Sequence, residues 1–251
     1  MSLPVFVADL DAFLAGERPA LPAVGDRYAL TGSEGRHAAT VKRLTVGEQL
    51  MLIDGHGSGV VAVVEGVDKA ALQLRIQSQE TFPVGDVTIV QALPKSERSE
   101  LAVDLMTQGG VDRIVPWQAS RSIAKWGNKA EKAQAKWRSA AVAAAKQSRR
   151  LAIPHIAPLA ATADVVELVR ATVAAGGTAL MLHEAASEPF TSVAFSEPLV
   201  LIIGPEGGLA PEEVERLSAA GAKPVLLGPE VLRTATAGLV ALAAYGALYR
   251  W

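Results

Sequence analysis

The spacing of apolar positions changes near residue 80 and divides the chain into two regions. In the first region, short apolar runs separated by turn residues predict strands at residues 27–30, 48–53, 60–64 and 72–76. Asp54 and three glycines within residues 55–59 separate two of these runs, and they predict a hairpin because Asp and Gly tolerate positive φ. Residues 1–80 are therefore expected to form a small β-rich domain.

From residue 87 onward, apolar runs alternate with amphipathic segments, which is typical of a parallel sheet covered by helices on both faces. The expected strands are residues 87–92, 113–117, 179–183 and 199–203, and the expected helices are residues 94–108, 129–149 and 164–175. Leu101 and Leu105 are expected on the buried side of the first helix. Pro83 and Gly85 mark a connection at residues 81–86, so the fold class is α/β with a β-rich first domain.

Residues 199–251 contain two glycine turns, each at the end of an apolar run. The first turn is Gly-Pro-Glu-Gly-Gly at residues 204–208, and the second is Leu-Gly-Pro-Glu at residues 227–230. Turns at the carboxyl ends of neighbouring parallel strands usually line a ligand crevice. Neither turn fits a phosphate-binding motif, and the Glu206 carboxylate would repel phosphate. The glycines are instead expected to let the backbone approach a flat or hydroxyl-bearing ligand.

Arg233 follows the second turn and precedes an alanine-rich segment that is expected to be helical. A cation is unfavourable at a helix N-terminus, so this position favours an Arg233 side chain directed at an anionic substrate over one that lies free on the surface. Thr234 is expected to cap this helix, whereas Ala210 offers no capping oxygen to the helix that begins at Pro211. His183 follows a predicted strand end and is expected near the same crevice, although a buried, hydrogen-bonded histidine is the commoner outcome.

Composition excludes several chemistries. The chain has no cysteine, which rules out disulfides and thiolate-ligated metals, and its four histidines have no metal-ligand spacing, so no metal is expected. The apolar runs are far shorter than the roughly 20 residues that span a bilayer, so no membrane partner is expected. The first residues lack the pattern of a secretory signal, and the expected location is cytoplasmic.

Positive charge gathers in the middle of the chain. Residues 91–150 carry 12 Lys and Arg against 5 Asp and Glu, about +7, whereas the whole chain has a net charge of −2. This excess has two interpretations, a solvated helix face and a surface that binds a polyanion. A second basic group, residues 36–43, is expected on an exposed helical turn, where a scattered surface is an equally good interpretation.

Five stretches, in the same order along the chain, resemble the ribosomal RNA small subunit methyltransferase E family. They are RHAATVKRLTVGEQLMLIDGHG, QALPKSERSELAVDLMTQGGVDRIVPWQASRSIAKW, KWRSAAVAAAKQSRRLAIP, LIIGPEGG and LLGPEVLRTATAGLVAL. The resemblance implies a PUA-like RNA-binding β-barrel over residues 1–80. It also implies a SPOUT α/β domain over residues 81–251, with a trefoil knot within about 180–251.

The resemblance further implies a homodimer that uses S-adenosylmethionine to methylate N3 of a uridine in 16S rRNA, the RNA of the small ribosomal subunit. By position, it implies cofactor binding by Leu182, Ile203, Gly204, Pro205, Glu206, Gly208, Leu227, Gly228, Leu232 and Thr234. It implies RNA binding by Arg36, His37, Lys42, Arg43, Lys95, Arg98 and Arg121. Arg233 is the candidate catalytic residue, because a cation would stabilise negative charge that develops on the uracil ring.

The chain departs from the family pattern at three places. Ala235 stands where a glutamate is frequent, Glu230 stands where a basic residue is common, and Thr-Gln-Gly-Gly at 107–110 replaces an acidic residue, leucine and glycine. Two other functions are compatible with the fold: a non-catalytic rRNA-binding assembly protein, and an α/β enzyme that acts on a phosphorylated small molecule. No strong general base is evident, and solvent and His183 are both candidates to remove the uracil proton.

Overall fold

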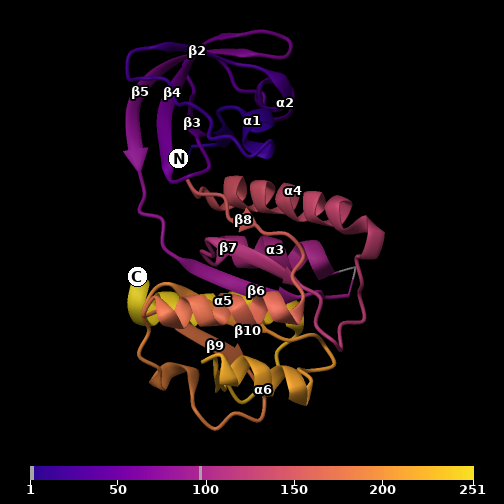
Figure 1. Cartoon of the computed structure of the whole chain (residues 1–251). Coiled ribbons are helices and arrows are strands. Elements are labelled where there is room, and N and C mark those ends of the chain that lie inside the picture. The colour runs from indigo at the N-terminus through magenta and orange to yellow at the C-terminus, as the bar shows by residue number, and fades with distance from the viewer. Residues whose placement is uncertain (1–2, 96–97) are drawn as a thin grey trace. The chain divides into compact units, whose positions relative to one another are not determined.

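The computed structural model describes residues 3–95 and 98–251 (Figure 1). The chain forms two compact units. Unit 1 comprises Met1–Val84 and Ala145–Ile153, and unit 2 comprises Gly85–Ala144 and Pro154–Trp251. The first unit therefore contains a segment from the middle of the chain in addition to its N-terminal region.

Within the described part of unit 1, five strands form one sheet in the order β1-β3-β4-β5-β2. They are β1 (Val5–Val7), β2 (Arg27–Leu30), β3 (Gln49–Ile53), β4 (Ser58–Val67) and β5 (Leu72–Thr81). β1 pairs with β3 in parallel, and the other pairs are antiparallel. Two register shifts between β4 and β5 bend the sheet around a core that includes Phe6, Leu52 and Leu74. The four predicted strands and the hairpin are confirmed, and β1 was not predicted.

Helical segments lie between the strands of unit 1: α1 (Leu10–Leu14), α2 (Gly32–Arg36) and a π-helical turn, His37–Val41. The end of a longer helix, α4 (Ala130–Ser148), also belongs to this unit from Ala145 onward. Gly35 allows α2 to lie against the end of β2, because a Cβ atom there would be only 2.3 Å from the carbonyl oxygen of Leu30. The predicted helical turn with its basic residues is confirmed by α2 and the π-helical turn that follows it.

In the part of unit 2 that the structure describes, six parallel strands form a sheet in the order β11-β9-β10-β6-β7-β8 (Figure 1). They are β6 (Val87–Ala92), β7 (Arg113–Trp117), β8 (His155–Ile156), β9 (Thr178–Leu182), β10 (Leu199–Ile203) and β11 (Lys223–Val225). The predicted parallel sheet is confirmed.

Helices cover both faces of this sheet. They are α3 (Ser99–Gln108), α4 (Ala130–Ser148), α5 (Thr162–Ala174), α6 (Pro211–Ala219) and α7 (Thr234–Tyr245), with 3-10 turns at Gly127–Lys129 and Phe190–Ser192 and a π-helical turn at Gly246–Arg250. Ile202 packs in the core with Val165 of α5, whereas Ile203 lies beside Gly238 of α7. Because successive side chains of a strand point to opposite faces, α5 and α7 lie on opposite sides of the sheet.

The sequence prediction for α3 was wrong in two respects. The helix begins at Ser99 rather than near residue 94, and Leu101 is 47% exposed. The buried side of α3 instead carries Ala102, Val103 and Met106. The buried stripe is thus shifted by one residue from the predicted one, and such a shift turns a side chain by about 100° around a helix.

The last helix returns from the edge of the sheet toward its middle. β11 is the edge strand beside β9, yet α7 packs against β6, β10 and α3. Gly238 permits this approach, since a Cβ atom there would lie 2.7 Å from Cγ of Met106 on α3. The domain boundary near residue 80 and the trefoil knot within about 180–251 stay predictions.

Candidate active site

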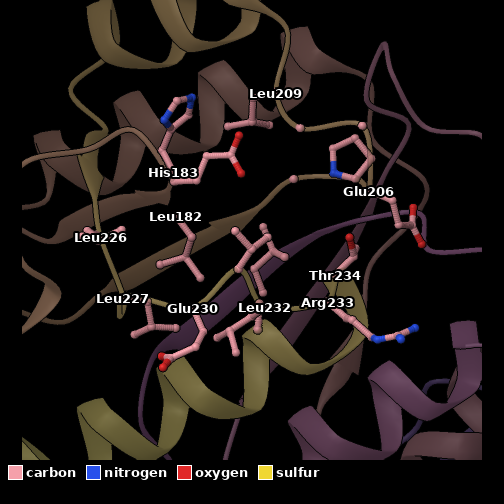
Figure 2. A pocket seen from close by; sticks show the side chains of 18 of the residues that line it. Leu182, His183, Glu206, Leu209, Leu226, Leu227, Glu230, Leu232, Arg233 and Thr234 are labelled. Atoms are coloured by element: carbon pink, nitrogen blue, oxygen red, sulfur yellow. The ribbon is translucent and has the colours of Figure 1, made fainter.

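The carboxyl ends of β9, β10 and β11 meet at one edge of the sheet. Met181 pairs with Ile202, and Leu182 pairs with Val225, so the three strands end at nearly the same level. The loops that follow them enclose a cavity of about 610 Å³, which we call the strand-end cavity (Figure 2). Its volume lies within the range of small-molecule sites, roughly 300–1,000 Å³.

All ten residues that the resemblance assigns to cofactor binding line the strand-end cavity. These residues are Leu182, Ile203, Gly204, Pro205, Glu206, Gly208, Leu227, Gly228, Leu232 and Thr234. Arg121 and Arg233 line it as well. In Figure 2, the side chains of Leu182, Leu227 and Leu232 lie near one another on the side of the cavity away from Glu206, where they offer apolar contacts to a flat ring.

The first glycine turn bends tightly around the rim of the cavity. Gly208 adopts a φ of +70°, which favours glycine, and its N–H donates to the carbonyl oxygen of Pro205 at 2.9 Å. Nη1 of Arg121 donates to the carbonyl oxygens of Leu209 at 3.1 Å and Gly207 at 3.3 Å. Arg121, predicted to face RNA, therefore also holds the shape of this turn.

The carboxylate of Glu213 also holds the first glycine turn in place, through hydrogen bonds to the backbone on either side of it. Glu213 is 4% exposed, and its Oε1 accepts hydrogen bonds from the N–H of Ser120 at 2.9 Å and from Oγ1 of Thr162 at 3.0 Å. Its Oε2 accepts from the N–H of Ala210 at 3.2 Å. One carboxylate of α6 thus joins the loop that carries Arg121 to the end of the glycine turn and to the first residue of α5 (Thr162–Ala174).

Glu206 lies at the end of the strand-end cavity opposite His183 (Figure 2). Its Oε1 accepts a hydrogen bond from the backbone N–H of Lys95 at 3.1 Å. Glu184 and Glu230 add two further carboxylates to the lining. Three carboxylates make the cavity unfavourable for a phosphate group, in agreement with the sequence argument.

The second turn leads into α7, and here the predicted cap was wrong. Arg233 is the N-cap residue, Thr234 is the first helical residue, and no side chain caps the helix. The carbonyl oxygen of Arg233 accepts from the N–H and Oγ1 of Thr236 at 2.9 and 3.1 Å. The Arg233 side chain is exposed, and Figure 2 shows its guanidinium group extending away from the leucines.

His183 lines the strand-end cavity and is partly exposed. Its backbone N–H donates to the carbonyl oxygen of Val225 at 3.0 Å, and its Nδ1 accepts from the N–H of Ala185 at 3.2 Å. A neutral imidazole that accepts at Nδ1 carries its proton on Nε2. In this arrangement the ring has no free lone pair to accept a proton from a substrate.

The other predicted RNA-binding residues lie in both units. Lys95 is exposed, and Arg98 is the N-cap residue of α3 in unit 2. In unit 1, exposed Arg36 ends α2 and partly buried His37 begins the π-helical turn, and exposed Lys42 and Arg43 follow that turn.

His37 differs from the other basic residues of unit 1 in its charge. Burial lowers the pKa of the imidazole, and Lys146 and Lys42 lower it further against the opposite effect of Glu34. The ring is therefore neutral near pH 7, and it would contact RNA as a hydrogen-bonding group rather than as a cation.

Sequence reasoning missed several residues of this region. Leu209 and Leu226, between the secondary-structure elements, and Ala237 of α7 also line the strand-end cavity, but a single apolar residue carries no signal of its own. Glu213 had a signal, since a glutamate three residues after an N-cap position often accepts from the N-cap backbone. Its contacts with Ser120 and Thr162 are long-range and left no trace in the pattern.

No three metal-ligating side chains converge among residues 3–95 and 98–251. Over the same residues, no helix combines the length and the apolar character needed to cross a membrane.

The sequence of this chain matches the models of two known protein families, and both agree with this architecture. A model described as an RNA methyltransferase domain matches residues 80–246, and one described as an RNA methyltransferase PUA domain matches residues 30–77. Together with the parallel sheet and its strand-end cavity, they define the protein as an RNA methyltransferase with a PUA domain.

Individual relatives narrow the class. The ribosomal RNA small subunit methyltransferase E of Mycobacterium bovis is 46% identical over 237 residues, which cover 92% of this chain and 90% of that protein. The Neisseria gonorrhoeae enzyme of the same name, solved with bound S-adenosyl methionine, has a TM-score of 0.85 at 25% identity, with 99% and 98% of the two chains covered. A Legionella pneumophila methyltransferase structure with bound SAM has a TM-score of 0.82 at 29% identity and covers 98% of each chain. The chain belongs to the ribosomal RNA small subunit methyltransferase E family.

Proposed function

We propose that the protein transfers the methyl group of S-adenosylmethionine to N3 of a uridine in 16S rRNA. The observation that carries this proposal is the strand-end cavity, because three loops from neighbouring parallel strands close around it and all ten implied cofactor positions line it. The substrate class follows from the family, whose named members act on small-subunit ribosomal RNA.

The lining of the cavity fits S-adenosylmethionine, which supplies an electrophilic methyl group when bound. Leu182, Leu227 and Leu232 would pack against the adenine ring. Carboxylates such as Glu184 and Glu230 would accept hydrogen bonds from hydroxyl and ammonium groups. The backbone of the first glycine turn can come close to the ligand because Gly204, Gly207 and Gly208 lack side chains.

Arg233 is the proposed catalytic residue. Uracil becomes a good nucleophile at N3 after it loses the proton there, and the ring then carries a negative charge. A guanidinium group beside the cavity stabilises this charge and makes loss of the proton easier. His183 keeps its lone pair engaged with the N–H of Ala185, so we assign the proton to solvent rather than to a side chain.

The test of Arg233 compares two exposed arginines. Replacing Arg233 with alanine should reduce turnover on small-subunit rRNA by about 100-fold or more, the effect expected when a group that stabilises developing charge is lost. The affinity for S-adenosylmethionine should change little. Arg216→Ala, an exposed α6 arginine outside the cavity lining, is the matched control and should keep wild-type turnover. Unchanged turnover of Arg233→Ala would remove this residue from the mechanism.

Calorimetric titration with S-adenosylmethionine tests the catalytic proposal as a whole. An assembly protein that kept the fold without the activity would bind rRNA but not the cofactor. Saturable binding supports the enzyme, and its loss on substitution of Leu227 or Leu232 by Asp would place the ligand in the strand-end cavity.

We also propose that the protein acts as a homodimer. Helices α3 and α7 pack together, and each leaves an apolar side chain exposed, Leu101 at 47% and Val240 at 38%. A second copy could bury these side chains. Light scattering should then give about twice the chain mass of 26.2 kDa, and Leu101→Glu should shift the protein toward the monomer.

A further inference from the structure

Unit 2 contains a second cavity, of about 570 Å³, whose chemistry differs from that of the first. It lies between the start of α3, the loop before α4 and the first turns of α4. We call it the tryptophan cavity, and the residues that matter for its chemistry are Ile123, Lys125, Trp126, Lys129, Lys136 and Trp137.

Aromatic and apolar side chains form much of the lining of the tryptophan cavity. Trp137 is 1% exposed, and its Nε1–H donates to Oγ of Ser99 at 2.7 Å, which fixes the indole ring. Trp126 is only partly buried and contacts Trp137 edge to face, with ring centroids 5.2 Å apart. Ile123, beside them, is 67% exposed. The cavity thus presents indole and aliphatic surface to solvent, and such surface suits a flat, apolar-faced ligand.

Lysines surround this apolar lining. Lys125, Lys129 and Lys136 all line the cavity, whereas Glu100 is the acidic residue that lines it. Nζ of Lys136 lies 3.8 Å from Oε1 of Glu100, so that pair is largely neutral. Lys125 and Lys129 leave the cavity with net positive charge. Aromatic rings combined with lysines are the means by which proteins hold single-stranded nucleic acid, through base stacking and phosphate contacts.

The tryptophan cavity and the strand-end cavity adjoin each other. The N–H of Lys95, which lines the tryptophan cavity, donates to Oε1 of Glu206, which lines the strand-end cavity. Arg121 lines the strand-end cavity, and Ile123, two residues later, lines the tryptophan cavity. A single RNA strand can therefore pass from one cavity to the other.

We infer that the tryptophan cavity binds an unstacked base of the rRNA strand close to the methylated uridine, with its ring against Trp126 and its phosphates near Lys125 and Lys129. This inference rests on the proposed function, because it takes the strand-end cavity as the place where the target uridine is methylated. It adds a second contact that holds the strand while the uridine is in place. Stacking on an indole tolerates any base, so the cavity contributes affinity for an unpaired strand rather than for one sequence.

The first test uses the fluorescence of the indole itself. Titration with a single-stranded oligouridylate should quench the tryptophan fluorescence of the wild-type protein, because a base stacked on an indole ring quenches its emission. Trp126→Phe should lose this quenching. Trp251→Phe is the matched control, since Trp251 is 79% exposed and lies outside the cavity lining, and it should retain the quenching. Equal quenching of Trp126→Phe and wild type would overturn the inference.

The second test leaves the aromatic packing intact. Lys129→Glu should raise KM for small ribosomal subunits about tenfold without changing kcat, and it should lower the slope of log affinity against log salt by about 0.7. Lys223→Glu is the matched control, since Lys223 is an exposed residue of β11 outside both cavity linings, and it should behave as wild type. An unchanged KM for Lys129→Glu would contradict the inference.

The two tests separate this inference from the proposed function. If the wild-type protein shows Trp126-dependent quenching but binds no S-adenosylmethionine, the proposed function fails while the base site stands. If the protein methylates rRNA but Trp126→Phe leaves the quenching unchanged and Lys129→Glu leaves KM unchanged, the base site fails while the proposed function stands.

Discussion

Each unit contains a buried glutamate, and the two are neutralised in different ways. Glu34 in unit 1 is 5% exposed, and its Oε1 accepts from Nζ of Lys146 at 2.6 Å. Glu213 in unit 2 is 4% exposed, and its donors in the described part of the chain are two backbone N–H groups and the hydroxyl group of Thr162. One carboxylate is held by a cation, and the other is held by neutral dipoles.

The two arrangements serve different ends. Glu34 and Lys146 form a largely buried ion pair, with side chains 6% and 14% exposed, in which each charge makes the other tolerable in a medium of low dielectric. Glu213 has two helix N-termini in place of a cation, since it lies in the first turn of α6 and accepts from Thr162, the first residue of α5. An ion pair constrains two side chains. A carboxylate that accepts from backbone groups constrains the main chain, which is what the rim of the strand-end cavity requires.

Breaking the ion pair should have the largest effect. Lys146→Met keeps an apolar side chain against Phe6 but leaves the Glu34 carboxylate buried without its cation. We expect the free energy of unfolding to fall by about 3–5 kcal/mol, as in other buried pairs that lose one partner. Urea unfolding followed by circular dichroism measures this change.

The double variant Lys146→Met with Glu34→Gln is the control for that explanation. It removes the uncompensated charge while the glutamine oxygen can still accept from the N–H of Val7. The double variant should recover much of the lost stability. A double variant as unstable as Lys146→Met would show that packing of the lysine stem, and not its charge, holds this region.

Removing the Glu213 side chain should lower the free energy of unfolding less than Lys146→Met does. It should, however, have the larger effect on the affinity for S-adenosylmethionine. Glu213→Ala leaves the N–H groups of Ser120 and Ala210 without their acceptor, and a loss of about 2 kcal/mol is expected for buried donors of this kind. The loop with Arg121 and the first glycine turn should then lose their fixed geometry, so the affinity for S-adenosylmethionine should fall as well. Chemical unfolding and calorimetric titration measure the two effects separately.

Glu212→Ala is the matched control, because Glu212 is the exposed neighbour of Glu213 in the same helical turn. It should change neither quantity appreciably. If Glu213→Ala loses stability while its affinity for S-adenosylmethionine stays at the wild-type value, Glu213 supports the fold without positioning the site.

The local part of this structure could be predicted from the sequence. Strands such as β6 and β10 are buried on both faces and stand out as continuous apolar runs. The two glycine turns predicted a crevice at the ends of neighbouring strands, and the strand-end cavity lies there. These features depend on residues close together in the chain, so their pattern carries the information.

Features that depend on distant residues could not be predicted. β1 is a three-residue strand whose pairing with β3 compensates for its length. Thr234 has a typical capping side chain, but it is already the first residue of α7, and the N-cap position falls on Arg233. Glu213 gains its role only when α5 and α6 come together, and the two indoles of the tryptophan cavity gain theirs only when α3 and α4 come together.

The smallest expected effect is a change of stability with pH. It involves His37, which lies beside the Glu34–Lys146 ion pair. Burial first, and then Lys146, lower the pKa of this imidazole below its usual value of about 6.5. As the pH falls below that value, the unfolded chain takes up a proton before the folded chain does, so the free energy of unfolding falls. Wild-type stability should thus decline between about pH 7 and pH 5, and His37→Gln should reduce the decline. His155 in unit 2 has its pKa lowered by burial and by Arg113 and Arg138, so His155→Gln should remove a separate part of the same decline. Urea unfolding of both variants across this range measures the two parts, and an unchanged pH dependence in His37→Gln would mean that neither burial nor Lys146 lowers the pKa of His37 in the folded chain.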